Sequence, residues 1–177
     1  YKLFRRDRQS REGGGVCIYI RDNIECSSVN FSNKTNEFEK MWLRFTYSDN
    51  VYYVACCYHP PAPCYQPAHL INELISDIDA ITQQKDCSPI IIVAGDFDLL
   101  KTDFLEEYCG LSLIVHDITH GKKVLDKVFI NRPDLFVSCV FRSLLKTKHM
   151  AVLISSDPSR IMCHASVRKH VAVYDVR

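Results

Sequence analysis

The distribution of hydrophobic and polar positions along the chain predicts several strands. Residues 16–21, 41–47 and 51–58 are rich in β-branched and aromatic side chains, which is typical of strands. The Ser-Asp-Asn turn signal between the second and third of these segments predicts a β-hairpin. Residues 90–94 form an apolar run that fits a buried strand. The same reasoning predicts three further strands, at 111–117, 124–130 and 149–155.

One segment has a clear helical period. Within residues 68–84 the apolar side chains recur every three or four positions and form one face. Residues 102–109 predict a short second helix, whereas the prolines of 59–67 exclude a helix or an inner strand there and predict a loop. His59 and His69 flank this loop, and we expect them on the surface rather than in a metal site. Strands with one clear helix between them, followed by more strands, indicate a mixed α/β fold.

Length and composition fit one globular domain. The chain has 177 residues, of which 47% are hydrophobic and 24% are charged. We assign residues 1–155 to the domain and residues 156–177 to a C-terminal tail or linker. No apolar run approaches membrane-spanning length and no signal peptide is visible, so we expect a nuclear or cytoplasmic protein that does not contact membranes. The nine cysteines lack a CxxC pair, which favours thiols in a reducing compartment over a disulfide framework.

Charge does not by itself indicate a nucleic-acid partner, because the net charge is only +1. A local basic stretch opens the chain, and two interpretations of it stay open. Its arginines could contact a DNA backbone, or they could form a solvated basic face. The arginines concerned are Arg5, Arg6, Arg8 and Arg11.

Two carboxylates follow directly after the buried strand at 90–94. Asp96 and Asp98 come immediately beyond it, after Gly95. A carboxylate at a strand end is held rigidly yet reaches solvent, which suits a general base or a metal ligand. The alternative is structural, since an aspartate at this position also accepts backbone N–H groups of the next turn.

Two other predicted strands also carry a polar residue at one end. Asp126 lies at the start of one strand and His149 at the start of another. An aspartate that accepts a proton from one imidazole nitrogen fixes the tautomer of the ring, and the other nitrogen can then face a phosphate. Asp96, Asp126 and His149 are therefore the candidate catalytic residues.

Several sequence words, in this order, resemble the endonuclease/exonuclease/phosphatase superfamily. The resemblance is strongest to the endonuclease domain of non-LTR (LINE-type) retrotransposons and covers about 150 residues. Each word is weak alone, and the ordered set is strong. The words are RRDRQSREGGGVCIYIR (5–21), EKMWLRF (39–45), CCYHPP (56–61), IIIVAGDFD (90–98), THGKKVLDKVFINRPDLF (119–136) and KTKHMAVLI (146–154).

The resemblance implies a fold and partners. The fold is a four-layer sandwich, with two mixed sheets packed face to face and helices outside. This chain would lack the opening N-terminal strands. The family reaction is Mg²⁺-dependent nicking of DNA phosphodiester bonds. The tail resembles the linker that leads to a reverse transcriptase domain in such elements.

The resemblance also implies roles for the catalytic candidates. The Asp of the family's GDxN word positions or deprotonates the attacking water and matches Asp96. The Asp of the LD word orients the catalytic His and matches Asp126. The His of the closing SDH word stabilises the phosphorane-like transition state and matches His149.

Four further positions are implied to bind the substrate. Tyr58 matches a Tyr near the phosphate site, and Thr119 matches a Thr that helps to bind the DNA backbone or phosphate. Asp98 stands where the family has an Asn that contacts the scissile phosphate. Lys148 stands where the family has the Asp of SDH, which helps to hold the metal.

These departures weaken the expected reaction. Asp98 replaces an amide donor with an acceptor, and Lys148 places a cation where a cation ligand should be. The strand with the Glu that is the main metal ligand is not in this sequence, so no metal ligand set is assigned. Two hypotheses remain: a truncated or degenerate DNA endonuclease with very weak activity, or an inert domain retained as a DNA-binding or interaction fragment.

Overall fold

A computed structural model describes residues 1–8, 14–31, 37–84 and 88–159. Arg11 and the end of the tail therefore lie outside the described residues. No helix in this described part is long and apolar enough to cross a bilayer. The strands are β1 (Lys2–Asp7), β2 (Gly15–Ile20), β3 (Cys26–Val29), β4 (Glu39–Tyr47), β5 (Asn50–Tyr58), β6 (Ile90–Asp96), β7 (Ser112–Leu113), β8 (Asp126–Ile130), β9 (Val137–Arg142) and β10 (Met150–Ser155). The helices are α1 (Pro67–Thr82), α2 (Asp103–Cys109) and the short 3₁₀ helix η1 (Pro133–Leu135).

A six-stranded mixed sheet forms the centre of the fold, with the order β3-β4-β5-β6-β8-β7. The predicted hairpin is confirmed as β4–β5, which pair up to Tyr47 and Asn50. Ser48 and Asp49 at its tip have positive φ, and tight hairpin turns need this conformation. β5 pairs with β6 in parallel, and α1 provides the crossover between them.

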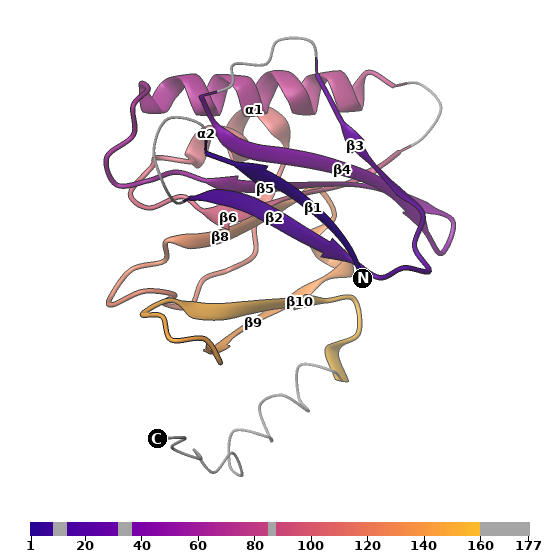
Figure 1. The fold of residues 1–177 in the computed structure, drawn as a ribbon. Coiled ribbons are helices and arrows are strands. Elements are labelled where there is room, and N and C mark those ends of the chain that lie inside the picture. Colours follow the sequence, from indigo (N-terminus) through magenta and orange to yellow (C-terminus); the bar gives the residue numbers. More distant parts are fainter. Residues whose placement is uncertain (9–13, 32–36, 85–87, 160–177) are drawn as a thin grey trace.

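The helices α1 and α2 cover one face of this sheet (Figure 1). The predicted helix begins at Pro67, which suits the first helical position because proline has no N–H to donate. Its apolar face is buried against alternate residues of the strands, and Trp42 belongs to this core. The fully buried members include Leu70, Leu74, Ile78, Ile81, Ala55 and Val93.

Two antiparallel hairpins, β1–β2 and β9–β10, cover the other face. The β9–β10 hairpin contributes Val140 to a second apolar core with Ile92 and Ile130. Neighbouring residues of β4 show on which side β1–β2 lies, because Lys40 contacts α1 whereas Glu39 binds Arg8. Within the described ranges no ladder joins the two hairpins into one sheet.

The mixed α/β fold predicted from the sequence is confirmed. The described elements form a helical layer, the six-stranded sheet and a layer of two hairpins. Three strands were not predicted, namely β1, β3 and β9. The predicted strand at 111–117 is reduced to the two residues of β7. The cysteines of the described ranges are free thiols, and Cys57 is buried in the sheet.

Candidate active site

Asp96 and Asp126 meet where two neighbouring strands of the large sheet end and begin. β6 ends at Asp96, β8 begins at Asp126, and the two residues are direct partners in the antiparallel ladder. The residue before Asp96 is Gly95, and the β5 backbone passes so close to it that a side chain would not fit. A Cβ atom at Gly95 would lie 1.9 Å from the Cys57 carbonyl oxygen. The site is therefore built on a close contact between strands that only glycine permits.

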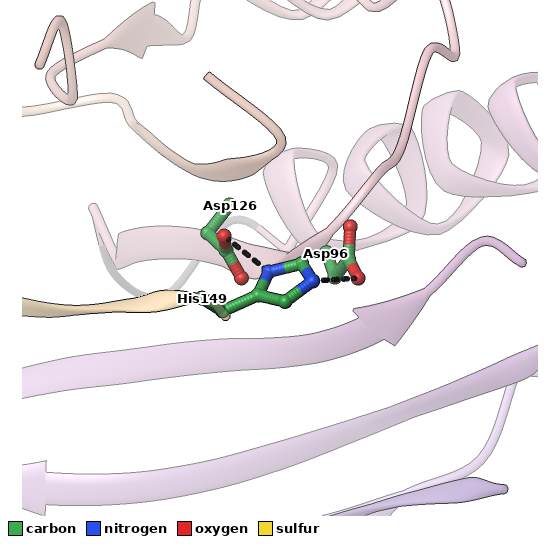
Figure 2. Close-up of side chains that lie close together, drawn as sticks. All are labelled: Asp96, Asp126 and His149. Atoms are coloured by element: carbon green, nitrogen blue, oxygen red, sulfur yellow. Dashed lines mark hydrogen bonds and ion pairs between the residues drawn. The ribbon is translucent and has the colours of Figure 1, made fainter. Parts of the chain in front are cut away.

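His149 reaches the same place from the hairpin layer. It lies directly before β10, and the next N–H, of Met150, donates to the Thr119 carbonyl at 2.7 Å. Figure 2 shows the imidazole between the two carboxylates. Its Nδ1 lies 2.8 Å from Oδ2 of Asp126, and its Nε2 lies 3.9 Å from Oδ2 of Asp96. The structure thus brings the three candidates together, and their catalytic roles stay a prediction.

The two carboxylates have different surroundings. Asp126 accepts a hydrogen bond from His149, so a neutral imidazole carries its proton on Nδ1 and presents the lone pair of Nε2 toward Asp96. Asp96 accepts the backbone N–H of Asp98 at 3.0 Å, as the structural alternative predicts. Burial raises the pKa of Asp96, the Asp98 hydrogen bond opposes this, and the charge of Asp126 raises it further. A raised pKa suits Asp96 to the part of a proton acceptor.

The same three side chains form the group that fits a cation. One ligand atom from each of Asp96, Asp126 and His149 lies within 4.8 Å of the others. Two carboxylates suit a hard divalent cation such as Mg²⁺, which commonly takes one or two carboxylates and keeps several waters. His149 Nδ1 is already occupied by Asp126, so the two carboxylates are the donors that fit best.

Thr119 holds the backbone at the start of β8, next to the cluster. Its side chain is fully buried, and its hydroxyl oxygen accepts the N–H groups of Leu125 and Asp126, both at 2.9 Å. The resemblance implies a contact with the DNA backbone, but a side chain without exposed surface cannot make that contact. Thr119 instead positions Asp126, through the backbone at the start of β8.

Tyr58 lies beside the cluster at the end of β5, in register with Asp96. The guanidinium of Arg8 lies 5.8 Å from the centre of its ring and forms an ion pair of 2.7 Å with Glu39. The buried Glu39 carboxylate therefore offsets the charge of Arg8. Arg5 pairs with Asp7 at the exposed surface, so it belongs to a solvated face, whereas Arg8 is held in a buried ion pair.

Asp98 and Lys148 do not join the Asp96–Asp126–His149 cluster. Asp98 has a positive φ of 43°, and its side chain lines a groove on the helical side of the sheet. Lys148 is exposed on the loop before His149. Among the described residues its amine has no hydrogen bond or ion pair, so its charge stays available at the rim of the site.

Two histidines near the site were not identified from the sequence. The His120 ring lies 4.5 Å from the His149 ring, centre to centre, and the two residues form a β-bridge. His59 was expected on the surface, but it is buried, and its backbone N–H donates to the Asp96 carbonyl at 2.8 Å. Burial lowers the pKa of His59 and so favours its neutral form. The sequence signal for this contact is that His59 directly follows Tyr58, the last residue of β5, as Asp96 is the last residue of the neighbouring β6.

Comparison with known proteins supports the fold. No protein-family model and no curated protein sequence matches the chain. Solved structures do match. The endonuclease domain of TRAS1, a telomere-specific non-LTR retrotransposon, has a TM-score of 0.63 at 14% identity, covering 86% of this chain and 79% of that one. The fold is that of the endonuclease/exonuclease/phosphatase superfamily.

Two further structures agree. Truncated Caenorhabditis elegans TDP2 has a TM-score of 0.59 at 11% identity, covering 86% of this chain and 74% of that one. The human Nocturnin catalytic domain, solved with a bound sulfate anion, has a TM-score of 0.56 at 13% identity, covering 87% and 72%. The resemblance stated from the sequence words is thus confirmed for the fold.

Proposed function

We propose that this chain carries a degenerate DNA phosphodiesterase site, of the kind that nicks one strand with a divalent cation. The observation that carries the proposal is the position of His149 between Asp126 and Asp96, on two neighbouring strand ends. An oriented imidazole beside a basic carboxylate is the pair of groups that in-line hydrolysis of a phosphodiester requires.

Each residue has a part in that reaction. Asp96 takes a proton from the attacking water, whose oxygen bonds to phosphorus as one P–O ester bond breaks. Asp126 holds the His149 ring so that Nε2 faces the phosphate. In its protonated form His149 donates to a phosphoryl oxygen and stabilises the negative charge that develops there. Tyr58 lies close enough, beside Asp96 in the sheet, to contact the same phosphate.

A divalent cation fits the two carboxylates, and Mg²⁺ is the ion that we propose. When bound it supplies charge stabilisation for the phosphate and the leaving oxygen. Few side chains could bind the cation, because among the described residues the group of possible ligands comprises only Asp96, Asp126 and His149. An ion held by so few ligands stays hydrated and weakly bound.

Two residues weaken the reaction further. Asp98 cannot donate an N–H from its side chain to a phosphate, because a carboxylate only accepts and this one lies in the groove outside the cluster. Lys148 brings a positive charge to the rim of a site that should attract a cation. Each lost transition-state contact commonly costs about a hundredfold in rate or more. Residual turnover should therefore be very slow.

The second candidate function is DNA binding without cleavage. Lys148 supports it, because an exposed amine without a partner in the described residues attracts a phosphate whether or not a metal is present. We further propose that a reverse transcriptase domain follows in the full-length protein. The resemblance of the tail supports this, and such a protein would act in the nucleus or the cytoplasm.

A nicking assay on supercoiled plasmid with Mg²⁺ or Mn²⁺ tests the proposal, with a filter-binding measurement of plasmid affinity beside it. We expect salt-dependent binding and no detectable nicking. His149→Ala and Lys148→Ala should weaken binding, whereas His69→Ala, at an exposed site on α1, should not. Chelator-sensitive nicking by the unmodified chain would overturn the expectation that Asp98 and Lys148 disable the site. Absence of any DNA binding would leave an inert domain.

A further inference from the structure

A groove of about 780 Å³ lies on the helical side of the sheet, next to the cluster. Its lining residues come from the loop after β5, the first half of α1, the loop after β6, and α2. Its walls are mostly apolar, with Ile71 and Ile75 from α1 and Leu99 and Phe104 from the opposite side. An open apolar groove of this kind in a folded domain marks a binding surface.

Two aromatic rings stand exposed in this groove. Phe104 and Tyr108 are one helical turn apart on α2, with ring centres 5.9 Å apart and an interplanar angle of 22°. They are 45% and 67% exposed. Aromatic rings presented to solvent serve as platforms for nucleobases, because every base has a π face that can stack on them.

The groove wall formed by α2 and the loop before it is anchored by packing and hydrogen bonds. Leu105 is fully buried and anchors α2 in the core. The amine of Lys127 donates to the Leu100 carbonyl at 3.2 Å and to the Thr102 hydroxyl at 2.9 Å, and so holds the loop between β6 and α2. The platform is therefore formed before any ligand arrives, and binding does not require ordering of this wall.

The groove and the cluster share a wall. Asp98 lines the groove, and its backbone N–H binds the Asp96 carboxylate at 3.0 Å. His59 also lines the groove, and its backbone N–H donates to the Asp96 carbonyl. Lys101 adds a cation for a phosphate at the rim, and Asn72 adds an amide for the edge of a base. A DNA strand whose phosphate lies at the cluster would therefore place a neighbouring nucleotide at this groove.

We propose that the groove receives an unstacked nucleobase of a DNA strand whose phosphate lies at the cluster. The inference rests on the proposed function, because that function brings the strand to Asp96. The inference also gives Asp98 a role, although Asp98 lies outside the cluster. The Asp98 carboxylate can accept a hydrogen bond from the exocyclic amino group of a base. The base stacks on the surface of Phe104 and Tyr108, with little dependence on its identity.

The test measures affinity without cleavage. A labelled single-stranded oligonucleotide and its abasic counterpart, which has the same backbone but lacks the central base, are titrated in EDTA. Fluorescence anisotropy reports the dissociation constants. Tyr108→Ala and Phe104→Ala should each weaken binding of the base-containing strand about tenfold and leave the abasic strand unchanged. Tyr108→Phe should retain the wild-type affinity, because it keeps the ring.

Tyr47→Ala is the matched control, because Tyr47 is 56% exposed at the β4–β5 turn, outside the groove. Equal weakening for both oligonucleotides, or none for either, overturns the proposal. So does binding of an amphipathic helical peptide, or of a second copy of the chain, in the groove in place of the oligonucleotide. Base-dependent binding that stays unchanged in His149→Ala and Lys148→Ala sustains this inference even where the proposed role of the cluster in holding DNA fails.

Discussion

The hydrogen bond between His149 Nδ1 and Asp126 Oδ2, 2.8 Å long, joins two layers of the fold. Asp126 belongs to β8 in the six-stranded sheet, and His149 belongs to the loop that enters β10 in the hairpin layer. The hairpin layer thus supplies the imidazole, and the six-stranded sheet supplies the carboxylate that orients it. Any change in the packing of the β9–β10 hairpin on the large sheet will move His149 relative to both carboxylates.

The first prediction concerns the tautomer of His149. We expect its neutral form to carry the proton on Nδ1, because Asp126 accepts there. Long-range ¹H–¹⁵N correlation spectra measure this directly. In Asp126→Ala the acceptor is gone, and the Nε2–H form should increase. Asp117→Ala, at an exposed carboxylate, should leave the spectrum of His149 unchanged. An Nε2–H majority in the unmodified chain contradicts the assigned geometry.

The second prediction concerns recovery of nicking. Lys148→Asp with Asp98→Asn should recover little, because too few carboxylates converge on a cation. Fusing a segment that supplies the family's Asn and Glu ahead of Tyr1 should restore nicking only together with both substitutions. Adding His149→Ala to that protein should then abolish it, which plasmid relaxation measures. Recovery by the fused segment alone would show that Asp98 and Lys148 do not impair the site.

The third prediction concerns a buried ion cluster beneath α1. Lys40 is buried, its amine lies 2.8 Å from Glu73 and also binds Asp77, and Asp77 accepts the Trp42 indole N–H at 2.8 Å. Lys40→Met leaves two carboxylates buried without their cation. We expect it to cost about 3–5 kcal/mol of unfolding free energy, measured by urea denaturation.

The pH dependence of that cost follows from Asp77. Burial raises the pKa of Asp77, and Lys40 opposes the rise, so Lys40→Met raises it further. A carboxyl with a raised pKa binds its proton more tightly in the folded state, so its stability contribution falls as pH rises. The cost of Lys40→Met should therefore be largest near neutral pH and shrink as pH is lowered through the raised pKa. Lys40→Met with Asp77→Asn should restore part of the stability, and a cost independent of pH refutes this account.

The fourth prediction concerns Gly95. Alanine there places a Cβ 1.9 Å from the Cys57 carbonyl oxygen, and backbone atoms cannot move aside without breaking the β5–β6 pairing. We expect a loss of about 3 kcal/mol, and shifts in the NMR resonances of Asp96 and His149. Gly110→Ala is the control, because its Cβ meets nothing within 4 Å. That substitution should cost only the strain of a positive φ and leave the cluster resonances unmoved.

The fifth prediction concerns the hairpin layer. In the described residues, β1–β2 and β9–β10 each pair only within themselves, so their outer strands offer unpaired edges. Leu3 and Tyr19 add exposed apolar surface on β1 and β2. The isolated chain should therefore associate in a concentration-dependent way in sedimentation experiments. A monomer that melts cooperatively at high temperature by calorimetry would count against this.

The sequence by itself determined the elements that have a strong period. The face of α1, the β4–β5 hairpin and the apolar run of β6 follow from local patterns, because burial on one side imposes a spacing of residues. The strand-end positions of Asp96 and Asp126 followed in the same way. β1 and β3 were missed because charged and small residues occupy them and only pairing with a neighbour makes them strands.

The tertiary structure decided everything that depends on distances between separate elements. Only the folded chain shows that the Thr119 hydroxyl serves the backbone of Asp126, that His59 is buried beside Asp96, and that Asp98 faces a groove. These contacts join residues that local patterns cannot relate, because their spacing in the sequence follows no helix or strand period. The pKa of Asp96 is likewise a property of burial and of neighbouring charges, which exist only after the two layers have packed.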